Sequence, residues 1–181
     1  MQDNAYLKCI NPKCSLEYPI SSTNVQCEKG HVLDVKYKNK SSPNLKETFY
    51  QRRNSKGSIF NESGVWRFRE LLNFCQIDTE DNDECAKFLV SLDGAEGRQS
   101  KPYQMSKAAE FIGINKEGLW LQPEGYNPSG SFKDNGMATA VTHAKLVGAK
   151  KIVCASTGNT SASAGMFAAN EGIKCDVYIP A

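Results

Sequence analysis

The clearest pattern of hydrophobic and polar positions lies in the last third of the chain. "KIVCA" at 151–155 and "CDVYI" at 175–179 are short runs rich in Val and Ile, and small-residue segments with helical character lie before and between them. Gly148 and Gly172 follow these two predicted helices, the first of which begins near Phe132, as C-terminal glycines do. The order of elements predicts an α/β fold with a parallel sheet.

A third strand is expected at "LWLQ", residues 119–122, so that three strands alternate with helices. The strands lack polar alternation, which predicts helices on both faces of the sheet and therefore three layers. Three strands fall short of the usual four to six. We therefore expect an incomplete sheet and regard these residues as the amino-terminal portion of a longer chain.

Weaker helical patterns precede the sheet. Phe68, Leu71, Leu72 and Cys75 recur at helical spacing and predict a helix that begins after Ser63 or Gly64. The segment "YQMSKAAEFIGI" predicts an amphipathic helix that ends at Gly113.

These patterns divide the chain into three segments. Residues 1–38 contain paired cysteines, residues 39–64 are polar and basic with little periodicity, and residues 65–181 contain the α/β pattern. We interpret 39–64 as a linker or an ordered arm. The predicted organisation is a small cysteine-rich module, this linker, and the beginning of an α/β domain.

Composition narrows the class of protein. The 22 basic and 20 acidic side chains give a net charge of +2, which lacks the basic footprint of a nucleic-acid binder and favours a small-molecule partner. The sequence contains neither an apolar run of about 18 residues nor a secretory signal. We expect a cytoplasmic protein without membrane contact, and its oligomeric state stays open, a homodimer included.

Four soft ligands crowd into the first 31 residues: Cys9, Cys14, Cys27 and His31. Zinc prefers four nitrogen or sulfur ligands in a tetrahedron, and two tight turns with two ligands each supply them. Pro12 and Gly30 favour such turns. The spacing predicts a structural, zinc-ribbon-like site, with ordinary thiols as the alternative.

Two Gly/Ser-rich turns, each at the start of a predicted helix, carry the candidate chemistry. Lys133 lies in "NPSGSFKD", and Asn159 lies in "STGNTS". In a parallel sheet such turns meet at one edge, where free N–H groups favour anions. A lysine amine can attack an aldehyde, and the short hydroxyls and amide can hold a carboxylate and a phenolate oxygen. The alternative interpretation is that the turn residues are ordinary helix caps and that the lysine is solvated.

Two other residues are interpreted as structural. His143 lies ten residues after Lys133, which is roughly 15 Å along a helix and too far for shared chemistry. Cys154 follows a buried-type strand pattern and is expected to be an inert apolar side chain.

The motifs "NPSGSFKDNGM" and "ASTGNTSAS" closely resemble those of threonine synthases, which belong to the pyridoxal-phosphate enzymes of fold type II, the tryptophan-synthase-beta-like family. The resemblance is strong from about Leu119 onward, extends to the cysteine-rich start, and is thin between them. It implies fold type II for the α/β domain and pyridoxal 5'-phosphate as cofactor.

By position, the resemblance implies that Lys133 forms the Schiff base with the cofactor and moves protons, and that Asn159 binds the cofactor's phenolic oxygen. Ser156, Thr157 and Thr160 match residues that hold the substrate carboxylate or neighbouring groups. The implied enzyme is a carbon-oxygen lyase acting on phosphates, which converts O-phosphohomoserine and water to threonine and phosphate. The cofactor supplies the electron sink, and the protein supplies orientation and proton transfer.

Two alternatives stay open. A threonine or serine dehydratase, or a beta-replacing enzyme, shares the same general plan. A zinc-ribbon binding module on a non-catalytic scaffold is the alternative from another class.

The sequence also departs from the family pattern. Asn135 stands where relatives commonly have arginine, and "GAEGRQSKPY" only loosely matches their upstream substrate loop. The family's glycine-rich loop for the cofactor phosphate and its polar partner for the pyridine nitrogen are not found within 1–181. We therefore expect these residues alone to bind cofactor poorly and to be inactive.

Overall fold

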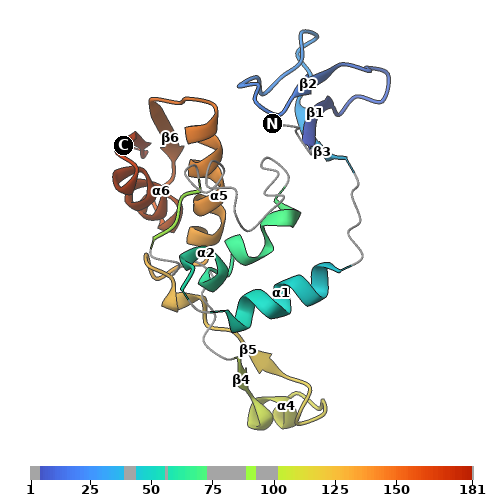
Figure 1. The fold of residues 1–181 in the computed structure, drawn as a ribbon, viewed down its shortest axis with the longest axis vertical. Helices are drawn as coiled ribbons and strands as arrows, with labels where there is room; N and C mark the ends of the chain where they lie inside the picture. Colours follow the sequence, from blue (N-terminus) through green and yellow to red (C-terminus); the bar gives the residue numbers. More distant parts are fainter. Residues whose placement is uncertain (1–4, 39–43, 56, 73–88, 93–101, 181) are drawn as a thin grey trace.

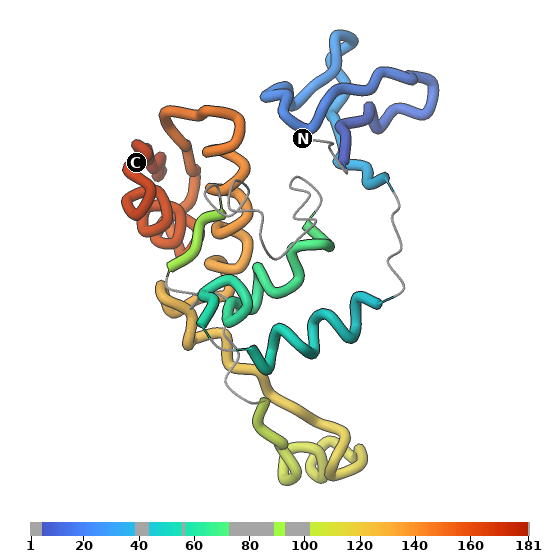
Figure 2. Tube along the Cα trace, in the orientation of Figure 1, coloured from blue at the N-terminus to red at the C-terminus, as the bar shows by residue number. Residues whose placement is uncertain are grey.

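The computed structural model describes residues 5–38, 44–55, 57–72, 89–92 and 102–180. Figure 1 shows an N-terminal part with β1, β2 and β3, a central group of helices, a small lobe around α4, and a C-terminal part with α5, α6 and β6. The tube in Figure 2 follows the same course from the N-terminal strands to the C-terminal end beside α6. The chain is thus a mixed α/β protein.

The first part, residues 5–38, is called the N-terminal module below. Its strands β1 (Ala5–Cys9), β2 (Glu17–Pro19) and β3 (Leu33–Tyr37) form an antiparallel sheet in the order β2-β1-β3. Cys9 pairs with Leu33 across the sheet. Its buried centre consists of three cysteine side chains, with Leu16, Tyr18 and Leu33 packed around them.

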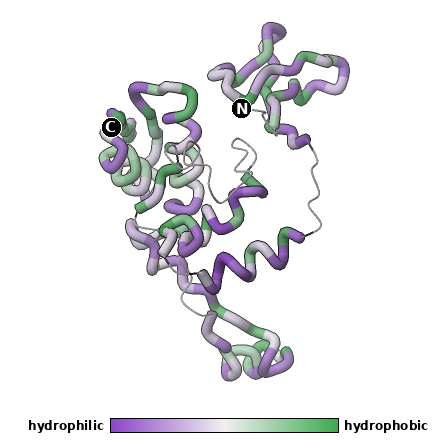
Figure 3. Tube along the Cα trace, in the orientation of Figure 1, coloured by the Kyte–Doolittle hydropathy of each residue, from purple (hydrophilic) through white to green (hydrophobic). Residues whose placement is uncertain are grey.

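Two helices occupy the segment interpreted as a linker or arm: α1 (Leu45–Asn54) and α2 (Ile59–Glu62). Helix α1 is largely hydrophilic (Figure 3), and it packs through specific contacts rather than an apolar stripe. The buried Arg52 donates hydrogen bonds to both carboxylate oxygens of Glu70 and to the Arg67 carbonyl. Phe49 meets the Phe68 ring edge-to-face, with centroids 4.9 Å apart. Because these contacts have no periodicity, the hydrophobic pattern did not reveal this helix.

The helix predicted after Ser63 or Gly64 is present as a 3-10 helix, η1 (Trp66–Leu71), with non-helical dihedrals at Phe68. Its buried members are Trp66 and Arg69, whereas Leu71 is exposed. The predicted α-helical stripe is therefore wrong at Leu71, and Cys75 lies outside the described residues.

The strand predicted at 119–122 forms β5 (Trp120–Leu121), but its assignment to the parallel sheet is wrong. It pairs antiparallel with β4 (Tyr103–Gln104) in a separate two-stranded sheet. Helix α4 (Ser106–Phe111) connects the two strands and ends before Gly113, as predicted. Both residues of β5 are exposed, so its apolar sequence does not indicate a buried strand.

The C-terminal elements follow the predicted order closely. After the short 3-10 helix η2 (Glu124–Tyr126) come α5 (Lys133–Leu146), β6 (Lys151–Ala155), α6 (Asn159–Asn170) and β7 (Lys174–Tyr178). Strands β6 and β7 are parallel neighbours. The predicted terminating glycines adopt left-handed dihedrals, with φ of 72° at Gly148 and 64° at Gly172.

The main core lies between α5, α6 and the segments that cover them. Trp66, Val90, Val141 and Phe167 are almost fully buried in one cluster, against which Ile152 of β6 packs. Hydrogen bonds support the packing, because the Trp66 indole nitrogen donates to the Val90 carbonyl at 2.7 Å. This core fixes α5 beside α6, as Figure 1 shows.

One face of the parallel sheet is exposed within the described chain. The Val153 side chain is 63% exposed, and the nearby Lys151 amine forms an exposed ion pair with Asp176 at 2.6 Å. The prediction that both faces are covered is therefore wrong for these residues, since the core cluster lies on the other face. None of the described helices combines the length and apolar character needed to cross a membrane.

Candidate functional site

The turn before α5 is built by a glycine and a serine. Gly130 adopts φ of 76°, and its N–H donates to the Asn127 carbonyl at 2.7 Å. The Ser131 hydroxyl accepts the backbone N–H of Lys133 at 3.2 Å, which satisfies one donor at the helix start. Lys133 is the first residue of α5 and is half-buried, with its Nζ 4.1 Å from the centroid of the Phe132 ring.

The residue after the lysine, Asp134, joins this turn to the next helix. Its fully buried carboxylate accepts hydrogen bonds from the Ser129 N–H at 2.7 Å and from the Ser129 hydroxyl at 2.5 Å. The Ser163 hydroxyl of α6 donates to the same carboxylate at 2.6 Å. Asp134 therefore connects the lysine turn, α5 and α6.

A second polar network lies around the same turn. The Asn127 and Asn135 amides each donate to Glu124 Oε2 at 3.1 Å. Asn127 also donates to the Ser131 carbonyl at 3.0 Å. Asn135 is thus used within the turn.

The turn before α6 is closed by its own serines. The Ser156 hydroxyl accepts the Gly158 N–H at 3.2 Å, and the Ser161 hydroxyl donates to the Ser156 carbonyl. Gly158 has φ of −125° and ψ of −155°, an extended conformation that other residues also adopt. The turn therefore does not depend on glycine for its backbone shape.

Three of the four predicted ligand-binding side chains in and after this turn are available, since the Ser156 hydroxyl already accepts the Gly158 N–H. Within the part of the chain that the structure describes, the side chains of Asn159, Thr157 and Thr160 have no hydrogen-bond partner. Asn159 is also the first residue of α6, where the leading N–H groups have no intrahelical acceptor. An unpaired amide and hydroxyls beside free backbone donors suit an anionic or phenolic oxygen.

One buried hydrogen bond connects the start of α5 to α6. Asp134 adjoins Lys133, and its partner Ser163 lies one helical turn after Asn159. The lysine and asparagine therefore stand at neighbouring ends of two packed helices. The expected route to this arrangement, two successive strands of one parallel sheet, is wrong because β5 belongs to another sheet.

Sequence reasoning missed the two residues that join the helices, Asp134 and Ser163. A usable signal was present, because Ser163 is a polar residue between alanines and falls four residues after Asn159, on the same helical face. The His143 Nε2 lies 3.1 Å from the Ile20 carbonyl of the N-terminal module, and Cys154 is half-buried.

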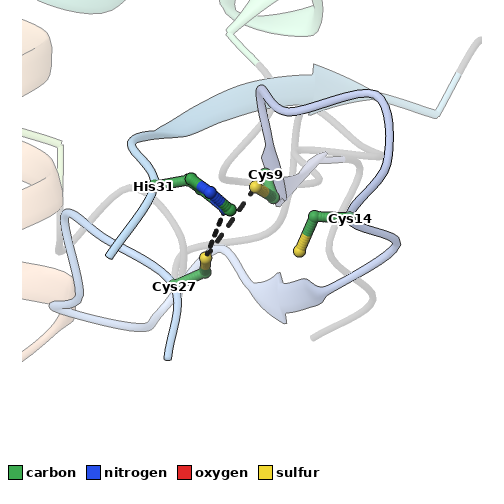
Figure 4. Close-up of side chains that lie close together, drawn as sticks. All are labelled: Cys9, Cys14, Cys27 and His31. Atoms are coloured by element: carbon green, nitrogen blue, oxygen red, sulfur yellow. Dashed lines mark hydrogen bonds between the residues drawn. The ribbon is translucent and has the colours of Figure 1, made fainter. Parts of the chain in front are cut away.

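The four predicted metal ligands of the N-terminal module converge. Figure 4 shows Cys9, Cys14, Cys27 and His31 around a common space, and their ligand atoms all lie within 4.8 Å of one another. The Cys9 and Cys27 sulfurs are 3.8 Å apart, and Cys27 Sγ is 3.7 Å from His31 Nδ1. A tetrahedral zinc with bonds of about 2.3 Å to sulfur holds its sulfurs about 3.8 Å apart. The donor set and its spacing therefore fit zinc.

The surroundings of the thiols differ. Burial raises the pKa of the Cys9 thiol. Burial also opposes ionisation of Cys27, but hydrogen bonds outweigh it, chiefly from the backbone of His31 and Lys29, and lower its pKa to about 7. Asn11 contacts the second ring nitrogen of His31, with Nδ2 to Nε2 at 3.1 Å, and so orients the ring. An orienting partner and a readily formed thiolate are typical of metal sites.

Comparisons with known proteins found one matching family and several similar proteins. The family described as pyridoxal-phosphate dependent enzyme matches residues 98–181. Threonine synthase of Methanocaldococcus jannaschii is 35% identical over 173 residues, which are 96% of this chain and 37% of that protein. Threonine synthase of Methanosarcina acetivorans is 48% identical over 44% of this chain and 19% of its own length, and that of Bacillus sp. is 61% identical over 34% and 18%.

The chain thus spans little more than a third of the longest-matching of these relatives. The matched family segment contains both turns described above, and pyridoxal phosphate is the cofactor that this family implies. Residues 98–181 thus match the family of pyridoxal-phosphate dependent enzymes, and along 96% of its length the chain is similar to a threonine synthase.

Proposed function

We propose that this chain contributes the lysine and asparagine of a threonine-synthase-type lyase, which converts O-phosphohomoserine and water to threonine and phosphate. The observation that carries the proposal is the pairing of Lys133 and Asn159 at neighbouring ends of α5 and α6. The similarity to threonine synthases supports the choice of substrate. The proposal includes a cytoplasmic setting and a small-molecule substrate.

Each residue has a stated task in this proposal. The Lys133 amine would hold the cofactor covalently at its aldehyde carbon, with loss of water, and would carry protons at the substrate. The Asn159 carboxamide, which has no partner among the described residues, donates to the cofactor's phenolic oxygen. Ser156, Thr157 and Thr160 bind the substrate carboxylate or adjacent groups through hydroxyls beside the first N–H groups of α6. Pyridoxal phosphate, when bound, supplies the electron sink for the substrate.

The N-terminal module has a separate, structural role in the proposal. Cys9, Cys14, Cys27 and His31 hold one zinc ion, and all four positions of a tetrahedron are then filled by protein. A closed site of this kind stabilises the fold and leaves no position for substrate.

The proposal is tested on the full-length protein. Incubation with pyridoxal phosphate and reduction by borohydride should attach the cofactor to the peptide that contains Lys133, as mass spectrometry would detect. Lys133→Ala should abolish this attachment and the release of phosphate from O-phosphohomoserine. Lys150→Ala, an exposed lysine after the same helix, should change neither. Attachment to another lysine in Lys133→Ala would refute the assignment, and turnover of serine or threonine without phosphohomoserine would instead identify a dehydratase.

A further inference from the structure

Asp134 is a buried carboxylate without a cationic partner. Its side chain has 0% exposure, and it forms no ion pair with any residue that the structure describes. Three donors surround it instead: the N–H and hydroxyl of Ser129 and the hydroxyl of Ser163, at 2.5 to 2.7 Å. Its place in the first turn of α5 adds the favourable field of the helix end. These interactions explain how the charge is accommodated there.

The same position could be stabilised more simply by an apolar side chain. Replacing a buried charge with a well-packed hydrophobic residue is often neutral or stabilising, so a buried charge is weak evidence of a role in stability. An apolar side chain, however, does not fix the relative orientation of the segments that it contacts. Hydrogen bonds do, because they constrain the distances and angles between the segments that they join. At Asp134 those segments are the lysine turn and α6.

We propose that Asp134 is the positioning residue that sets the placement of Asn159 relative to Lys133. Its link to Ser129 fixes the turn that precedes the lysine, and its link to Ser163 fixes α6 one helical turn after the asparagine. This inference rests on the proposed function of Lys133 and Asn159. It assigns Asp134 no contact with cofactor or substrate.

The neighbouring residue, Asn135, provides a matched control. It also lies in the first turn of α5 and also holds the lysine turn, through Glu124 and Asn127. Among the residues that the structure describes, its hydrogen bonds do not extend to α6, unlike those of Asp134. Both substitutions to alanine should therefore loosen the turn, and only Asp134→Ala should release the asparagine helix.

The first experiment is a pair of double-mutant cycles on the full-length protein, read as the dissociation constant of pyridoxal phosphate. Asn159→Ala should weaken cofactor binding several-fold in the otherwise native protein and in Asn135→Ala. In Asp134→Ala it should change binding less than twofold, because the carboxamide is already displaced. An equal effect of Asn159→Ala in all three backgrounds would overturn the proposal, since a general loss of stability leaves the two substitutions independent.

Ser163→Ala keeps the experiment decisive if Asp134→Ala does not fold. It removes only the link to α6 and leaves both contacts with Ser129. It should reduce the effect of Asn159→Ala in the same direction. A full effect of Asn159→Ala in this background would also refute the inference.

The second experiment needs no cofactor and so separates this inference from the proposed function. Hydrogen exchange of the cofactor-free full-length protein should become faster in the first two turns of α6 in Asp134→Ala and Ser163→Ala. Asn135→Ala should accelerate exchange in the turn 127–131 and leave α6 unchanged. If the native protein binds no cofactor, the proposed function fails and exchange alone decides the positioning role. Unchanged exchange in α6 of both Asp134→Ala and Ser163→Ala would refute it.

Discussion

Two glycines on either side of Lys133 should respond in opposite directions to the same substitution. Gly130 adopts φ of 76° in the turn before the lysine, and Gly136 lies within α5. A Cβ atom added at either position meets no atom within 4 Å. Packing is therefore the same for the two alanine variants, and only the backbone conformation distinguishes them.

The magnitudes follow from the two conformations. Alanine in the left-handed region costs about 1–2 kcal/mol, part of which is offset by the stiffer unfolded chain, so Gly130→Ala should destabilise by about 1 kcal/mol. Alanine inside a helix is preferred over glycine by about 1 kcal/mol, so Gly136→Ala should stabilise by that amount. The two variants should differ by about 2 kcal/mol, or roughly 30-fold in the unfolding equilibrium constant.

The assay is urea unfolding of the full-length protein, with the slope against denaturant compared between variants to exclude a change in mechanism. Gly148→Ala is the matched control, because its φ of 72° resembles that of Gly130 and its Cβ site is also open. It should destabilise by an amount similar to Gly130→Ala without altering attachment of the cofactor to Lys133. The reasoning fails if Gly130→Ala and Gly136→Ala shift stability in the same direction.

Three further predictions concern a buried hydrogen bond in the core, the loss of stability at low pH, and the metal. Thr142→Val should lower the free energy of unfolding in urea by about 1–3 kcal/mol, because the buried Val90 N–H loses its acceptor at 2.8 Å. The hydroxyl of Thr139 is exposed, so Thr139→Val should change the free energy of unfolding by less than about 0.5 kcal/mol. Burial opposes ionisation of Glu70, but hydrogen bonds from Arg52 outweigh it and lower its pKa below 4.5. The stabilisation from this ion pair is therefore present above pH 4.5 and is lost as the pH falls. Glu70→Gln should reduce this loss of stability at low pH in pH-dependent unfolding, and an unchanged profile would contradict the ion pair. Purified full-length protein should contain about one zinc per chain. Cys14→Ser should lose this zinc, and Cys154→Ser should keep it. An N-terminal module whose structure is unchanged after chelation would contradict a structural metal.

The sequence predicted best the elements whose cause is local. Helices α5 and α6 end where glycines supply left-handed backbone at 148 and 172, and β6 and β7 coincide with short runs rich in β-branched residues. The convergence of the four metal-ligand candidates also follows from local turns within the N-terminal module. For the helix ends and the strands, the residues that determine the structure lie next to one another in the chain. The metal-ligand candidates form two such local pairs, with Cys9 and Cys27 18 positions apart.

Strand β5 shows why apolar character alone is an incomplete guide. Trp120 and Leu121 have the composition of a buried strand, yet both are exposed and pair with β4. The pairing partner of a strand depends on segments far away in sequence, which a short apolar run does not identify. Helix α1 shows the reverse, since Arg52 attaches a mostly polar helix to Glu70, 18 positions later.

The candidate site depends on the kind of contact that such patterns do not encode. Asp134 and Ser163 are 29 positions apart and belong to different helices. Their hydrogen bond joins the lysine turn to the helix that follows the second turn, although β5 lies in a separate sheet. A parallel sheet was therefore not needed on both sides of the site, because a buried carboxylate performs the same alignment. Since hydrogen bonds constrain direction where apolar packing constrains mainly volume, the polar contacts between α5 and α6 determine the geometry that Lys133 and Asn159 can adopt.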